Sequence, residues 1–195
     1  MKTIYCIGDS NTFGHDPRSR MGERYGEGVR WTGRLALAGY QVIDTGRNGL
    51  TIPDERELPA LCRRIREAGP VDAVTVMLGT NNLLKGAVAE EAAGRMEKLL
   101  RALAESSRGE KLVLIAPPPM VLGEWVQTQS LIRESRRMTE EFRSAARRTG
   151  AVFADAGQWG VELTFDGVHF TAQGHAAFAA GLLELLAEIL PEDHL

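Results

Sequence analysis

The chain has 195 residues, of which 44% are hydrophobic and 25% charged. This length suits a single domain over residues 1–195, with enough apolar side chains to build a core without metals or disulfides. A formal net charge of −3 and a pI near 5.9 give no reason to expect nucleic-acid binding.

The sequence predicts a cytoplasmic protein without a membrane span. Its N-terminus lacks the basic and apolar regions of a signal segment, and nowhere are there ~18 consecutive apolar residues. The only cysteines, Cys6 and Cys62, form neither a disulfide framework nor a metal-binding spacing. We therefore expect neither a structural disulfide nor a metal site built on cysteines.

Short apolar runs rich in Val and Ile alternate with stretches of helical periodicity. In chain order they are strand Thr3–Ile7, helix Val29–Ala38, strand Gln41–Thr45, helix Asp54–Ala68, strand Ala73–Leu78, helix Val88–Ala104, strand Leu112–Ala116, helix Ser130–Arg148, strand Val152–Ala154 and helix Thr171–Leu190. The second helix starts just after Pro53, a residue type that is favoured in the first turn of a helix, and Thr171 is a suitable cap for the last helix.

Five strand-then-helix units predict an α/β fold, a three-layer α/β/α sandwich around a parallel sheet. The strands read as continuous apolar runs, which is typical of strands covered on both faces. The carboxyl ends of parallel strands meet at one edge of the sheet, so the segments that follow them lie together.

Small polar residues follow these strands. Ser10 comes after the first strand in GDSNT, Gly49 after the second in RNGLT, and Asn81 after the third in GTNN. Asp166 and His169 come beyond the fifth strand in DGVHF. Ser, His and Asp at one sheet edge are the inventory of a serine hydrolase.

Each of these residue types fits a required task. A serine hydroxyl needs a base to accept its proton, and imidazole has a suitable pKa. Asp166 stands three residues before His169, a spacing that lets it hold the imidazole tautomer. Backbone N–H groups of Ser10 and Gly49 and the Asn81 amide are candidate oxyanion donors. Ser10 could alternatively cap a helix, although Asp9 or Asn11 can do this instead.

The four segments, in this order, resemble the sequence blocks of the SGNH hydrolase (GDSL esterase/lipase) superfamily over nearly the whole chain. The stretch GDSNTFGHDP followed by RWTGRLA also resembles the arylesterase and carbohydrate-esterase branch. The resemblance implies a flavodoxin-like sandwich with a five-stranded parallel sheet that hydrolyses esters without a metal or a cofactor. It matches Ser10, Asp166 and His169 to the catalytic positions, and Ser10, Gly49 and Asn81 to the oxyanion positions.

Two blocks depart from the family pattern. Asn82 replaces the usual Asp of the third block, and its amide oxygen can keep the acceptor contacts that support the loop. Asn48 replaces a frequent serine of the second block and could bond to backbone. Asn48, Asn82, Trp31 and His15 are further candidates for the substrate-binding site. For Trp31, as for Trp125 and Trp159, ordinary core packing is the alternative.

The remaining histidines are assigned no chemistry. His175 is expected on the surface or in the packing of the last helix, and His194 in the C-terminal tail. The predicted partner is a small-molecule ester with a short acyl group, such as acetyl on a sugar or an aryl alcohol. A homo-oligomer is compatible with the sequence, because α/β hydrolytic domains commonly associate through rim loops.

Two other functions remain open at this point. The same triad would serve an acyltransferase, in which an alcohol or a peroxide accepts the acyl group in place of water. Whether the pocket excludes water decides between hydrolysis and acyl transfer. A non-catalytic flavodoxin-like domain that binds a mononucleotide or flavin is the alternative from another class, although SNTFG offers few glycines for a phosphate loop.

Overall fold

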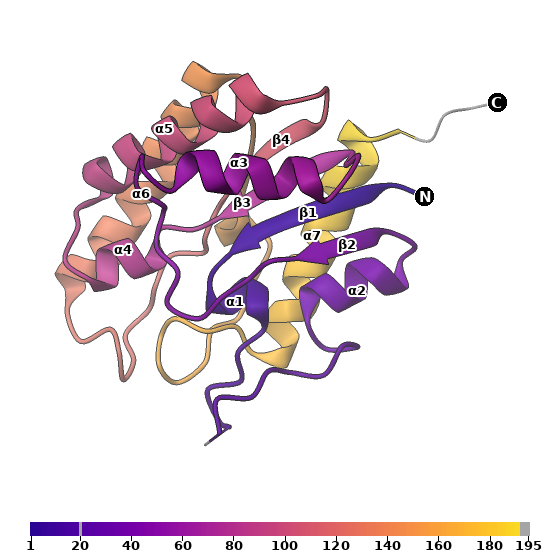
Figure 1. The fold of residues 1–195 in the computed structure, drawn as a ribbon. Helices are drawn as coiled ribbons and strands as arrows, with labels where there is room; N and C mark the ends of the chain where they lie inside the picture. Colours follow the sequence, from indigo (N-terminus) through magenta and orange to yellow (C-terminus); the bar gives the residue numbers. More distant parts are fainter. Residues whose placement is uncertain (20, 192–195) are drawn as a thin grey trace.

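Five parallel strands form one sheet in the order β2-β1-β3-β4-β5 (Figure 1). The computed structural model describes residues 1–19 and 21–191, so His194 lies outside the described residues. The strands are β1 Thr3–Gly8, β2 Gln41–Asp44, β3 Ala73–Met77, β4 Lys111–Ala116 and β5 Val152–Asp155. The predicted α/β class and five-stranded parallel sheet are confirmed.

Helices cover both faces of this sheet (Figure 1). One face carries α2 (Trp31–Leu37) and α7 (Ala172–Ile189). The other carries α3 (Leu58–Glu67), α4 (Thr80–Leu84), α5 (Ala89–Ser106) and α6 (Gln129–Thr149). Two further short elements, α1 (Ser10–Phe13) and a 3₁₀ turn (Ala156–Gln158), directly follow β1 and β5. Within the described residues, no helix is long and apolar enough to cross a membrane.

Alternate residues of the central strands enter two separate cores. In β1, Ile4 and Cys6 pack with α2 and α7, whereas Tyr5 and Ile7 pack on the opposite side with α3 and α5. All four are at most 4% exposed. This explains why the strand reads as an unbroken apolar run, because side chains that alternate between faces are buried on both.

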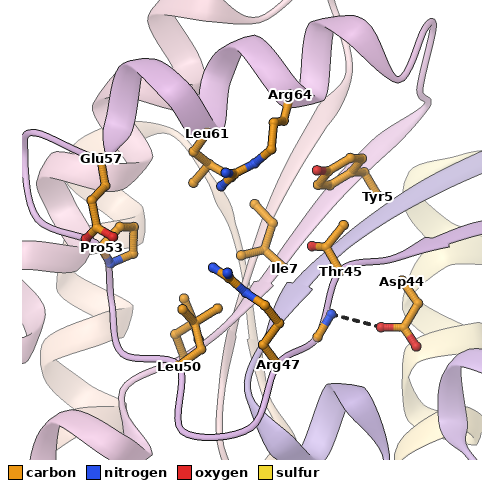
Figure 2. A pocket seen from close by; sticks show the side chains of 12 residues that line it. Tyr5, Ile7, Asp44, Thr45, Arg47, Leu50, Pro53, Glu57, Leu61 and Arg64 are labelled. Atoms are coloured by element: carbon orange, nitrogen blue, oxygen red, sulfur yellow. Dashed lines mark hydrogen bonds between the residues drawn. The ribbon is translucent and has the colours of Figure 1, made fainter.

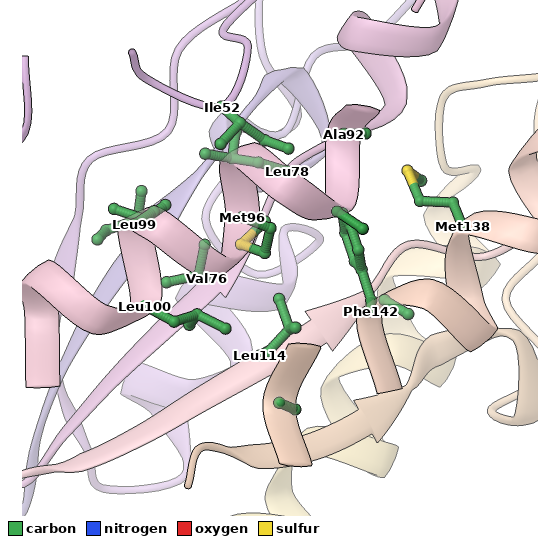
Figure 3. Close-up of a cluster of buried hydrophobic side chains, with 14 of the residues drawn as sticks. Ile52, Val76, Leu78, Ala92, Met96, Leu99, Leu100, Leu114, Met138 and Phe142 are labelled. Atoms are coloured by element: carbon green, nitrogen blue, oxygen red, sulfur yellow. The ribbon is translucent and has the colours of Figure 1, made fainter. Parts of the chain in front are cut away.

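The larger core lies between the sheet and α5 and α6 (Figure 3). Met96, Leu99 and Leu100 from α5 meet Leu114 of β4 and Phe142 of α6, and none of the five is exposed to solvent. The same core contains Ile7 of β1 and Val76 of β3, so α5 and α6 also pack against two of the strands whose carboxyl ends carry the polar segments.

The helix boundaries differ from the prediction mainly at α3. The helix begins at Leu58 rather than Asp54, because Asp54 to Glu57 form a separate turn closed by a hydrogen bond from Glu57 N to Asp54 O. Pro59, not Pro53, occupies its first turn. Two one-turn helices, α1 and α4, were not predicted, since a single turn has no hydrophobic periodicity to detect.

Loss of the Phe142 ring should destabilise the fold. Phe142 is fully buried, so Phe142→Ala removes packing and leaves a cavity, at an expected cost of about 3–5 kcal/mol in the free energy of unfolding. Phe165, which is 57% exposed, provides the control, and Phe165→Ala should change stability little. Urea denaturation measures both, and equal midpoints for the two variants would contradict this account of the core.

Candidate active site

Ser10 is the first residue of α1, at the point where β1 ends. Asp9 caps this short helix, since its Oδ1 accepts a hydrogen bond of 3.0 Å from Asn11 N. The cap is therefore the residue next to Ser10, and the Ser10 hydroxyl is left for another contact. The N–H groups of a first helical turn have no acceptor within the helix, which leaves the Ser10 amide available to a ligand.

His169 contacts both other members of the predicted triad. Its Nε2 lies 3.0 Å from Ser10 Oγ, and its Nδ1 lies 2.7 Å from Asp166 Oδ2. The three side chains come from opposite ends of the chain, and all three residues are at most 6% exposed. Both distances are those of hydrogen bonds, so the serine, imidazole and carboxylate form one connected chain.

Asp166 is held as a carboxylate by a turn that wraps around it. Its Oδ1 accepts hydrogen bonds from Val168 N at 2.8 Å and His169 N at 2.9 Å. Burial alone would raise the pKa of Asp166, but the hydrogen bonds from the His169 ring and from these two amides outweigh it and hold the pKa well below its usual range. An ionised Asp166 fixes the proton of His169 on Nδ1 and leaves Nε2 facing Ser10 as the acceptor.

Asn11 ties the histidine segment to the serine segment, a role that sequence reasoning missed. Its Oδ1 accepts from Phe170 N at 2.9 Å, and its Nδ2 donates to Val168 O at 3.1 Å. The two bonds bracket His169 on either side. The sequence alone makes Asn11 a candidate only for a helix cap, and its position directly after Ser10 is the one signal that points to this role.

The three predicted oxyanion donors follow β1, β2 and β3, which are neighbours in the sheet. Gly49 lies in a turn closed by Leu50 N and Arg47 O, with a φ of 71° that favours glycine. The side-chain amide of Asn81 donates to Leu50 O at 3.0 Å and reaches Asp9 Oδ2 at 3.4 Å. One good hydrogen bond thus orients the Asn81 amide, and its second N–H makes only a long contact.

Asn82 supports the same loop rather than facing a ligand. It is 4% exposed, and its Oδ1 accepts a hydrogen bond of 3.0 Å from Ile52 N. This is an acceptor contact of the kind expected for the residue that replaces the family's Asp. The backbone carbonyl of Leu50 and the amide of Ile52 are both held by the start of α4, through Asn81 and Asn82.

Two rings pack edge-on against the imidazole of His169. The ring centroid of His15 lies 4.8 Å from it and that of Trp125 lies 4.9 Å from it. Burial and the neighbouring His169 lower the pKa of His15, so this ring is neutral near pH 7. His15 therefore lies beside the candidate catalytic base, and its part in substrate binding stays a prediction.

Trp125, not Trp31, is the tryptophan beside the triad. Trp31 is 1% exposed, donates from Nε1 to Asn11 O at 2.9 Å and packs against Phe178, so the structure places it in the core and corrects its assignment to substrate binding. Trp125 is 53% exposed and its backbone N donates to Asp166 O. Its loop reaches that turn because Gly123 has no side chain, and a Cβ there would lie 2.4 Å from Asp166 C.

Asn48 and His175 lie outside this cluster. Asn48 is exposed in the turn that precedes Gly49, where no side-chain contact to the triad is present within the described residues. His175 is fully buried on α7, and Trp31 N donates to its Nδ1 at 3.4 Å, which agrees with the packing role expected for it. Among residues 1–19 and 21–191, no group of three or more His, Cys, Asp or Glu side chains could hold a metal ion.

Asp9 should make the stability of the fold depend on pH. Burial raises the pKa of Asp9 to about 6, despite the Asn11 amide and His169, which lower it. Because the pKa in the folded state exceeds that of the unfolded chain, its stabilising contribution is complete below pH 3.8 and is lost as the pH rises through about 6.

In Asp9→Asn, the part of the pH dependence of unfolding that belongs to Asp9 should disappear. For one proton, the slope of the free energy of unfolding against pH is at most about 1.4 kcal/mol per pH unit. Urea denaturation at a series of pH values from 4 to 8 compares the two proteins. Identical slopes in wild type and variant would contradict the assignment of this proton to Asp9.

Asn11→Ala should weaken both stability and activity. It leaves Phe170 N–H and Val168 C=O without their buried partner, at a cost of about 1–3 kcal/mol in the free energy of unfolding. It also frees the segment that carries His169, so we expect kcat for an activated ester to fall more than KM rises. A variant with unchanged kcat would show that Asn11 does not position His169.

A model of the GDSL-like lipase/acylhydrolase family matches residues 6–177 of this chain. A search among curated proteins finds no significant match. Solved structures, however, resemble nearly the whole chain.

An aryl esterase from M. smegmatis is 27% identical, with a TM-score of 0.84 over 97% of this chain and 100% of that one. A protein from Agrobacterium tumefaciens that is assigned as an arylesterase is 31% identical, with a TM-score of 0.83 and the same coverage. A carbohydrate acetylesterase family member from Sinorhizobium meliloti is 25% identical, with a TM-score of 0.83 over 97% of this chain and 99% of that one.

These matches agree with the order of the Ser10, Gly49, Asn81 and His169 segments along the chain and with the sheet that assembles them. The family match spans all four segments. The chain is a carboxylic ester hydrolase that belongs to the GDSL-like lipase/acylhydrolase family.

Proposed function

We propose that this chain hydrolyses esters of short acyl groups, with acetyl esters of aryl alcohols as the preferred class, through an acyl-enzyme on Ser10. The observation that carries the proposal is the connected chain of hydrogen bonds from Asp166 through His169 to Ser10 Oγ. This arrangement supplies a base for the hydroxyl proton and a carboxylate for the positive charge that the base acquires.

In the first half of the reaction, Ser10 Oγ attacks the carbonyl carbon while His169 Nε2 takes the hydroxyl proton. The carbonyl π electrons move onto oxygen, where the Ser10 and Gly49 amides and the Asn81 side chain stabilise the negative charge. The tetrahedral intermediate then collapses, the ester C–O bond breaks, and His169 returns its proton to the leaving alkoxide. The products are the free alcohol and an acyl group on Ser10.

In the second half, water takes the place of the alcohol. His169 removes a proton from the water as its oxygen attacks the acyl carbon, and the same donors stabilise the second oxyanion. Collapse of this intermediate breaks the bond to Ser10 Oγ, which recovers the proton from His169. The carboxylic acid leaves and the free enzyme is restored, so no cofactor is consumed.

The leaving group is expected to be apolar because His169 protonates it next to Trp125. The Trp125 ring lies against His169 and is half exposed. Three further exposed apolar residues lie in the loop that carries Trp125 and in the loop that carries Asp166: Val121, Leu122 and Phe165. These loops are joined by hydrogen bonds from Glu124 N to Phe165 O and from Val121 N to Gly167 O. An aryl ring can cover this surface, and the resemblance to aryl esterases supports the same class.

Ser10→Ala should abolish turnover of p-nitrophenyl acetate, because no other hydroxyl lies at His169 Nε2 in the described residues. The expected loss in kcat is at least about 10⁴-fold. Ser130→Ala, on the exposed start of α6, is the matched control and should retain full activity.

The spectrophotometric assay measures both variants. Retention of most activity in Ser10→Ala would overturn the proposed nucleophile. Comparison of phenyl acetate with an acetylated sugar on the wild-type protein tests the substrate class, since a higher kcat/KM for the sugar would contradict the aryl preference.

A further inference from the structure

A pocket of about 390 Å³ opens between α3 and the edge of the sheet formed by β1 and β2 (Figure 2). Its volume falls in the range of small-molecule binding sites, about 300–1,000 Å³. None of Ser10, Asp166 and His169 lines it. The proposed ester hydrolysis therefore leaves this pocket without a function.

Two guanidinium groups reach into the pocket from opposite walls. Arg64 extends from α3 and Arg47 from the loop after β2, and Figure 2 shows their head groups converging between the helix and the sheet. Neither side chain has a hydrogen-bond or ion-pair partner among the residues that the structure describes. Two unpaired cations that face one another repel, and a bound anion would relieve the repulsion.

The carboxylates on the pocket walls are already engaged. Asp44 pairs with Arg24 at 2.7 Å and also accepts from Gly46 N at 3.0 Å. Glu57 accepts a hydrogen bond from Asp54 N at 2.9 Å. Within the described residues, neither Asp44 nor Glu57 forms an ion pair with Arg47 or Arg64, so both arginines are available for a ligand.

The floor of the pocket is apolar. Tyr5 and Ile7 come from β1, Leu78 follows β3, and Leu61 comes from α3, and each is at most 6% exposed. A small inorganic anion would leave this surface uncovered, whereas an anion with an apolar tail would bury it. The ligand chemistry that matches both features is a carboxylate head on a hydrocarbon body.

We propose that the pocket under α3 binds an amphiphilic monocarboxylate, with its head group between Arg47 and Arg64 and its tail over Tyr5, Ile7 and Leu61. Guanidinium groups bind carboxylates through charge-assisted, frequently bidentate hydrogen bonds. Both arginines are exposed on the surface side, so the ligand enters from solvent without displacing core residues.

The pocket lies close to the proposed active site at Ser10, so a test has to separate the two sites. Arg47 N donates to Gly8 O, two residues before Ser10, and the turn from Arg47 to Leu50 also carries Gly49. A carboxylate is also a product of ester hydrolysis. Binding must therefore be measured with the nucleophile absent and, separately, with the active site blocked.

Isothermal titration calorimetry of octanoate against the full-length Ser10→Ala protein provides the test. Octanamide, which lacks the charge, and acetate, which lacks the tail, are the ligand controls. Arg64→Met removes one head-group contact, and Arg63→Met changes the neighbouring exposed arginine, which does not line the pocket. Wild-type protein treated with a fluorophosphonate gives a second sample in which the active site is blocked. Arg47→Met gives a second pocket variant should Arg64→Met fold poorly.

Octanoate should bind more tightly than either ligand control, and binding should be about tenfold weaker in Arg64→Met and unchanged in Arg63→Met. Octanoate should also bind the fluorophosphonate-treated protein with unchanged affinity. Absence of binding, equal affinity for octanamide, or loss of binding when the active site is blocked would each overturn the proposal. Because the main titration uses Ser10→Ala, its outcome does not depend on ester hydrolysis.

Discussion

The two hydrogen bonds from Asn11 to the backbone around His169 are the constraint on which the proposed active site depends. They join residues that are 157 and 159 positions apart, and so fasten the segment after β5 to the end of β1. β1 is the second strand from one edge of the sheet and β5 forms the opposite edge, so the histidine segment must cross β4 and β3 to reach Ser10. Without this connection the 3.0 Å approach of His169 Nε2 to Ser10 Oγ would have no support from the serine side.

Two buried carboxylates interact electrostatically with His169, and their surroundings differ in a way that suits the proposed chemistry. Asp166 accepts hydrogen bonds from two amides and the imidazole, and stays ionised. Asp9 has fewer donors for the same degree of burial, and its pKa is raised to about 6. Asp166 can then stabilise an imidazolium at His169, while Asp9 caps α1 and contacts Asn81.

Much of the fold could be predicted because its signals are local. The strands were recognisable as apolar runs, and the polar residues after them identified the edge at which the site lies. What could not be predicted depends on distant contacts: Asn11 meets partners at the far end of the chain, and Trp31 and Trp125 are indistinguishable until the fold buries one and exposes the other. The pocket under α3 was also missed, because Arg47 and Arg64 converge only after β2 and α3 are in place.

The measurement that tests the central claim most directly is labelling with a fluorophosphonate, followed by peptide mass spectrometry. If the geometry makes Ser10 the nucleophile, the wild-type protein will take up one phosphonyl group per chain, on the peptide that contains Ser10. His169→Ala should then react far more slowly, because the hydroxyl has lost its base. Labelling at a different residue, or equal labelling rates in the wild type and in His169→Ala, would contradict the account.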